Sequence, residues 1–174
     1  MTDIEQKKET LKQRAETLKI QLAKEEVSGT IIQGLEFLLA DERYVIDSTF
    51  VVEVIPLKDL ADLPCTPDFI LGIINVRGRI ISVIDLKKFF NLPEKGITNL
   101  NRVIIVNHDG IELGILADEI AGNNEIYVDK LQSKITTITE LQDDFIIGIT
   151  EDRLIVLDIE EFLLNEKLII NEEV

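Results

Sequence analysis

The chain has 174 residues, 45% of them hydrophobic, which is enough apolar material for a folded core. Its formal net charge of −15 argues against nucleic acid or an anionic membrane surface as a partner. No apolar run approaches the ~20 residues that cross a bilayer, and the charged N-terminus lacks the apolar stretch of a signal peptide. The single cysteine, Cys65, cannot form an intramolecular disulfide, so we expect a cytoplasmic protein.

Residues 1–34 are predicted to form a helical arm followed by a hinge. An apolar stripe recurs at helical spacing, on the residues Ile4, Leu11, Ala15, Leu18 and Leu22. The first 27 residues carry six basic and six acidic side chains, so the remaining chain holds the whole net charge. The stripe fits either a solvated helix packing weakly on the domain or a short coiled-coil or partner-binding arm. Glycines at 29 and 34 predict the hinge.

Beyond the arm, short β-branched runs separated by turn residues predict strands. The predicted strands are 35–40, 44–46, 80–84, 103–106, 111–116 and 154–157. Asp109-Gly110 favours a tight hairpin, because glycine tolerates a positive φ. All four prolines lie between Pro56 and Pro93, which predicts a connection with little regular structure around residues 56–68.

Two stretches of this β region recur later in the chain. Phe69–Ile73 reappears as Phe145–Ile149. Arg79–Phe89 reappears, with one residue fewer, as Arg153–Phe162. Such self-similarity is typical of a fold built from related units.

The repeat predicts two related β units, residues 35–95 and 96–165, in one domain followed by a tail at 166–174. Asp85 and Asp158 would each cap the helical turn that ends its unit, because a carboxylate can accept bonds from unpaired N–H groups there. A unit of about 60 residues is marginal alone, so the two should share a buried interface. The predicted fold class is all-β, and small barrels are favoured because closure removes exposed edges.

Enzymatic chemistry has little support in the sequence. The single histidine, His108, falls at a predicted hairpin tip, where a turn residue is favoured over a base or metal ligand. Cys65 lies in Pro-Cys-Thr-Pro without a partner histidine to make it a thiolate. Capping accounts for Asp85 and Asp158. We therefore expect no catalytic residue, no metal and no cofactor.

The most informative turn is Asn75-Val76-Arg77-Gly78. Asparagine at the first position and glycine at the fourth predict a type I turn. The Asn75 side chain would hydrogen-bond to the backbone ahead of it, and Gly78 would let the chain leave the turn without steric strain. Arg77 would extend into solvent, where its guanidinium can bind a partner's carboxylate. An internal ion pair between Arg77 and one of the chain's own carboxylates is the alternative.

This stretch resembles the CheW family of chemotaxis coupling proteins. The family pattern of a glycine, an Asn-x-Arg-Gly turn and an apolar strand ending in Asp-Leu is met within residues 64–86. Further similarities follow in the family's order, at 35–46, 51–54, 114–118 and 145–164. The resemblance covers about residues 35–165. Val76 stands where leucine is commoner, and the N-terminal arm is longer than the family leads us to expect.

The resemblance implies two packed SH3-like barrels of five strands each, acting as a non-catalytic adaptor. One surface would bind the cytoplasmic tip of a methyl-accepting chemoreceptor and another the regulatory domain of the histidine kinase CheA. The protein would then associate with membrane receptor arrays through these partners, without inserting into the membrane. Matching motif positions imply receptor contacts at Arg77, Gly72, Val51 and Glu53. Gly72 has an alternative role, since small residues beside buried strands often permit close backbone approach.

Other interpretations stay open. The same scaffold also fits an array that controls surface motility or another output. An enzyme built on a β-barrel scaffold is disfavoured, because the sequence shows no cluster of polar residues that would converge on one site. A CheW-like regulatory domain cut from a kinase is disfavoured by the separate arm and by the tail, which favour a free-standing protein.

Overall fold

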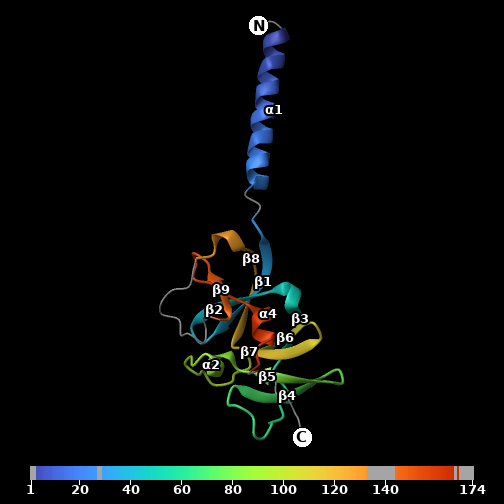
Figure 1. Cartoon of the computed structure of the whole chain (residues 1–174), viewed down its shortest axis with the longest axis vertical. Helices are drawn as coiled ribbons and strands as arrows, with labels where there is room; N and C mark the ends of the chain where they lie inside the picture. Colours follow the sequence, from blue (N-terminus) through green and yellow to red (C-terminus); the bar gives the residue numbers. More distant parts are fainter. Residues whose placement is uncertain (1–2, 27–28, 133–143, 167, 169–174) are drawn as a thin grey trace.

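The computed structural model describes residues 3–26, 29–132, 144–166 and 168, residues 3 and 20–26 by their backbone alone. The chain forms one long helix and two five-stranded sheets, and the helix stands away from the sheets (Figure 1). The all-β class and the helical extension predicted from the sequence are confirmed.

The first sheet has the strand order β8-β1-β2-β10-β9. Its strands are β1 (Ile31–Leu39), β2 (Glu42–Asp47), β8 (Glu119–Tyr127), β9 (Ile146–Ile149) and β10 (Ile155–Leu157). The second sheet has the order β3-β6-β7-β5-β4. Its strands are β3 (Val51–Pro56), β4 (Ile70–Val76), β5 (Arg79–Ile84), β6 (Arg102–His108) and β7 (Ile111–Ala117). These bounds contain every predicted strand except for two end residues. Ala40 ends the first predicted strand but lies outside β1, and Leu154 begins the last predicted strand but lies outside β10.

The two halves of the chain exchange hairpins between the sheets. The half 35–95 holds nearly all of β1 to β5 and the half 96–165 holds β6 to β10. The hairpin β1–β2 nevertheless joins β8, β9 and β10, while β6–β7 joins β3, β4 and β5. Four pairs of strands join the halves, the parallel pairs β2–β10 and β5–β7 and the antiparallel pairs β1–β8 and β3–β6. The predicted boundary at residue 95 therefore does not separate the sheets, because each sheet needs strands from both halves.

The predicted hinge is wrong for residues 31–34, which begin β1. Gly34 pairs with Asp47 on β2 and with Asn124 on β8. A Cβ atom at Gly34 would lie 2.3 Å from Cγ2 of Val45, so packing inside the sheet requires glycine here. The connection between α1 (Asp3–Glu26) and the sheet is correspondingly shorter than the sequence predicts.

Two short helices follow the repeated strands. Asp85 caps α2 (Leu86–Phe89), its carboxylate accepting from the Lys87 N–H at 2.9 Å. Asp158 caps α4 (Ile159–Leu163) in the same way, accepting from the Glu161 N–H at 3.0 Å. Both predicted caps are confirmed. Two single 3-10 turns, Ser48–Phe50 and Val128–Lys130, complete the described elements.

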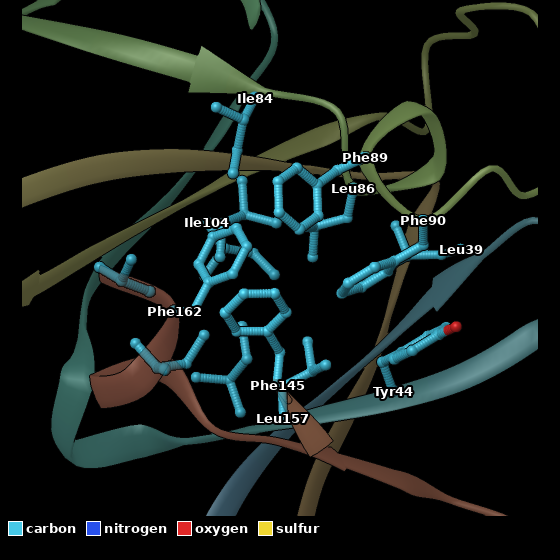
Figure 2. Close-up of a cluster of buried hydrophobic side chains, with 14 of the residues drawn as sticks. Leu39, Tyr44, Ile84, Leu86, Phe89, Phe90, Ile104, Phe145, Leu157 and Phe162 are labelled. Atoms are coloured by element: carbon cyan, nitrogen blue, oxygen red, sulfur yellow. The ribbon is translucent and has the colours of Figure 1, made fainter. Parts of the chain in front are cut away.

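The main core lies between the sheets, and the repeated phenylalanines meet there. Phe89 of α2 contacts the rings of Phe69, Phe145 and Phe162 edge-on, at centroid distances of 5.1, 5.6 and 5.5 Å. Figure 2 shows Phe89, Phe145 and Phe162 converging from both halves of the chain. Phe69 and Phe145 are equivalent in the repeat, as are Phe89 and Phe162. This cluster is the shared interface that the repeat predicts.

Each sheet also encloses a smaller core of its own. In the second sheet it consists of Ile74, Val76, Ile81, Val83, Val103, Ile105 and Leu116. In the first sheet it consists of Val45, Ile126, Leu154 and Val156. Two small cores flanking a larger common one suit two curved sheets packed face to face.

The helix α1 exposes every side chain described in it, residues 4–19. Ile4, Leu11 and Leu18 of the predicted stripe are 69%, 64% and 57% exposed, whereas Leu22 lies outside the described side chains. The helical prediction is confirmed. Among the described residues, no helix is both long and apolar enough to span a membrane.

Phe89→Ala should lower the free energy of unfolding by about 3–5 kcal/mol, because it removes the ring that both halves contact and leaves a cavity. Urea denaturation followed by circular dichroism measures this loss. The control Ile4→Ala removes an exposed side chain and should change stability by less than about 0.5 kcal/mol. A loss at Phe89 no larger than at Ile4 would contradict a shared core centred on this ring.

Burial raises the pKa of the Asp85 carboxyl, against a smaller lowering by nearby Lys87. The native state then holds this proton more tightly than the unfolded chain, so the contribution of Asp85 to stability declines as pH rises through its folded pKa. Asp85→Asn keeps the cap without the charge. The stability of this variant relative to wild type should therefore rise between about pH 3 and pH 7. Denaturation at several pH values tests this, and a constant difference would contradict it.

Candidate functional site

The hairpin between β4 and β5 has a two-residue turn at Arg77 and Gly78. Both residues have positive φ, 53° and 85°, which is the type I′ pattern rather than the predicted type I. The strands supply the reason, because a type I′ turn matches their right-handed twist and a type I turn would splay them. The predicted role of Asn75 is confirmed, since its Oδ1 accepts from the Gly78 N–H at 2.8 Å.

Arg77 combines the two roles that the sequence leaves open. Its side chain is 80% exposed, and its Nη2 lies 3.2 Å from Oε2 of Glu53 on β3. An ion pair this exposed contributes about 0–1 kcal/mol, so it orients the guanidinium more than it stabilises the fold. Most of the donor surface of Arg77 faces solvent.

Glu53 is shared between two arginines. Its side chain is 19% exposed, and its Oε1 lies 3.5 Å from Nη2 of Arg79, which also pairs with Glu112 of β7. β3 and β4 are opposite edges of the second sheet, so the pair between Glu53 and Arg77 brings the two edges together. The second sheet is thus curved so that its two edge strands approach each other, and the charged network of Glu53, Arg77 and Arg79 lies at one end of the smaller core that this sheet encloses.

Val51 and Glu53 face different surroundings although they are two residues apart. A β-bulge between them shifts the register, so Val51 pairs with Val106 of the main core and Glu53 pairs with Ile105 of the smaller core. A bulge commonly redirects a side chain in this way. Val51 lines an open groove of about 400 Å³ between β1, β8 and β3, together with Gln33, Leu35, Ser48, Val54 and Asn123.

Gly72 lies buried beneath the connection that follows β3. A Cβ atom there would lie 2.3 Å from the carbonyl oxygen of Ala61, which accepts a hydrogen bond from the Ile73 N–H. Its φ of 149° also disfavours other residues. Close backbone approach therefore explains this glycine, and a receptor contact at Gly72 stays a prediction.

The sequence reasoning missed three exposed apolar side chains near this site. Val52 and Val54 on β3 are 48% and 37% exposed, and Ile80, next to Arg79, is 63% exposed. Alternation along Val51–Ile55 could not have identified the outward valines, because it would place Glu53 in solvent and Val52 and Val54 on the buried face, the reverse of the structure. Ile80 could not be found either, because it lies in a continuous apolar run that predicts burial.

His108 and Cys65 lie apart from this network in the sequence and in their contacts. His108 ends β6 rather than occupying the tip, and its ring meets Phe50 edge-on at 5.4 Å. Its Nε2 lies 3.6 Å from carboxylates of Asp109 and Glu160. Cys65 is exposed in the long connection.

Comparison with known proteins agrees with this geometry. A family model described as the CheW-like domain matches residues 33–167. The chain belongs to the CheW-like family. It is 34% identical over 149 residues to the chemotaxis protein CheW of Treponema pallidum, covering 82% of this chain and 88% of that protein. It is 28% identical over 154 residues to the CheW of Helicobacter pylori, covering 81% and 87%.

A solved structure supports the same assignment. The crystal structure of the scaffolding protein TtCheW from Thermoanaerobacter tengcongensis superposes with a TM-score of 0.68 at 34% identity, covering 77% of this chain and 88% of that one. The two curved sheets are therefore the two SH3-like five-stranded barrels of a CheW-like protein. Family membership makes this chain a chemotaxis adaptor that couples chemoreceptors to the histidine kinase CheA.

Arg77→Asn should leave the free energy of unfolding unchanged or raise it by up to about 1 kcal/mol. Asparagine adopts positive φ more readily than arginine, and this gain offsets the loss of a largely solvent-exposed ion pair. Thermal and urea denaturation measure the change. A loss above about 2 kcal/mol would mean that the Arg77 side chain is a structural element rather than an available contact.

Proposed function

We propose that Arg77, Glu53 and Val51 form the surface by which this adaptor binds the cytoplasmic tip of a methyl-accepting receptor. The observation that carries the proposal is the 80% exposure of Arg77 on a tight hairpin, with Glu53 orienting its guanidinium. A planar guanidinium held in this way suits a carboxylate on a helical partner. The groove beside Val51 would add apolar contact, with Val54 on its wall.

The regulatory domain of CheA would bind a separate surface, at barrel edges and the loops between barrels, by apolar packing. The edge strand β9 belongs to the sheet that does not carry the Arg77 hairpin, and its Ile147 is 45% exposed. Separate surfaces on one rigid body allow both partners to bind together. The receptor state can then bias the kinase through a coupling free energy between the sites.

The coupling would need no catalytic step. Stiff surfaces at fixed relative positions are sufficient, and the shared core between the barrels supplies them. The protein would act in the cytoplasm and reach membrane receptor arrays through its partners, without binding nucleic acid or inserting into the bilayer. The charge of −15 supports this, because it opposes contact with polyanions.

Arg77→Asn should weaken binding of a soluble receptor-tip fragment by about 10-fold or more, since a buried arginine contact typically contributes at least 1–2 kcal/mol. Binding of the CheA regulatory domain should stay within about twofold, because that surface lies elsewhere. Calorimetric titration of each partner measures both effects.

Arg153→Asn is the matched control. Arg153 is also an exposed arginine at positive φ, 62°, in the corresponding segment of the other barrel. It should leave receptor binding within about twofold. If Arg77→Asn leaves receptor binding unchanged, or if both variants weaken it equally, the proposed surface is wrong.

A further inference from the structure

The helix α1 carries an apolar seam bordered by cations on both sides. Each residue advances the helix by about 100°, so Ile4, Leu11, Ala15 and Leu18 fall within roughly 40° of Leu11. The same arithmetic places Lys7 and Arg14 along one border and Lys8, Lys12 and Lys19 along the other. Among residues 4–19, whose side chains are described, the acidic residues Glu5, Glu9 and Glu16 lie toward the back.

This helix stands apart from the adaptor domain. It precedes the region matched by the family model, which begins at residue 33. Figure 1 shows it as a rod extending away from both sheets, and all its described side chains are exposed. Three large apolar side chains more than half exposed on one helix face lack cover within the described part of the chain.

The charges select among possible occupants of the seam. Spacings of seven, four and three residues place Ile4, Leu11, Ala15 and Leu18 at core positions of a coiled coil, with Lys8 at a further core position. The flanking positions hold the cations Lys7, Lys12, Arg14 and Lys19 and the carboxylate of Glu5. A second copy in parallel would set Lys7 against Lys12 and Arg14 against Lys19. Like charges at these positions destabilise pairing, so parallel self-association is disfavoured.

A membrane surface fits the seam less well than a helix does. The seam is narrow, as in a coiled coil, whereas helices that lie on membranes bury a broad apolar face with aromatic residues. The sequence of α1 contains no aromatic residue. The carboxylates on its back and the −15 charge of the chain also oppose an anionic surface.

We propose that α1 is a second docking surface, which binds an amphipathic helix of another protein whose own apolar seam is bordered by Asp and Glu. The apolar seams pack together and the acidic borders pair with the four flanking cations of α1. This surface is distinct from the Arg77 hairpin and does not depend on the proposed receptor contact.

A designed heptad peptide tests this surface, with leucine in the seam and glutamate at all flanking positions. The full chain should bind it at least tenfold more tightly than the same peptide with lysine at those positions, and added salt should narrow this difference. Fluorescence anisotropy of the labelled peptides measures both affinities. Equal affinity for the two peptides would overturn the proposal.

Two double variants with the same change in net charge locate the contact. Lys12→Gln with Lys19→Gln removes two border cations and should weaken binding of the acidic peptide by about two- to fivefold. Gln6→Glu with Gln13→Glu adds two charges away from the seam and should leave binding nearly unchanged. Equal weakening by both pairs would indicate general charge attraction and overturn the proposal, provided circular dichroism shows the helix intact in both.

Two further measurements distinguish the proposed helical partner from a second copy of the chain and from a membrane surface. Sedimentation velocity should show a monomer, and α1-dependent dimers would assign the seam to a second copy. Vesicles containing anionic phosphatidylserine should not bind the chain in an α1-dependent way. Either contrary result would replace the helical partner with that occupant.

Discussion

The contact on which the structure depends is the meeting of equivalent phenylalanines between the barrels. Phe69 and Phe89 from the first half pack with Phe145 and Phe162 from the second. Because the halves also exchange hairpins, each barrel is incomplete without the other half. Neither half can bury its apolar surface alone, so the two barrels are expected to fold as one cooperative unit.

This constraint also fixes the candidate site. β3 carries Val51 on the side of the main core and, after a bulge, Glu53 at the end of the smaller core. Glu53 then orients Arg77 from across the barrel. The proposed receptor contact is thus tied to the inter-barrel core through a single strand, which suits a protein whose role is to relate two partners in space.

The sequence predicted the local features of the fold well, because turn residues, capping carboxylates and apolar runs act over short distances. It predicted the hairpins, the caps at Asp85 and Asp158, and the role of Asn75. It could not reveal the hairpin exchange, since related halves have the same local pattern whichever partner they pair with. The turn class at Arg77 and the packing of Gly34 were missed because strand twist and a neighbouring side chain decide them.

Native-state hydrogen exchange tests the central claim, that the two barrels fold as one cooperative unit. The amides of Val83 and Val156 lie on equivalent interior strands, β5 and β10, in different barrels. Their opening free energies should converge on the same value as denaturant is added, with the same dependence on its concentration. If one barrel opens at a distinctly lower free energy while the other stays protected, the barrels are separate units and the account of a shared core is wrong.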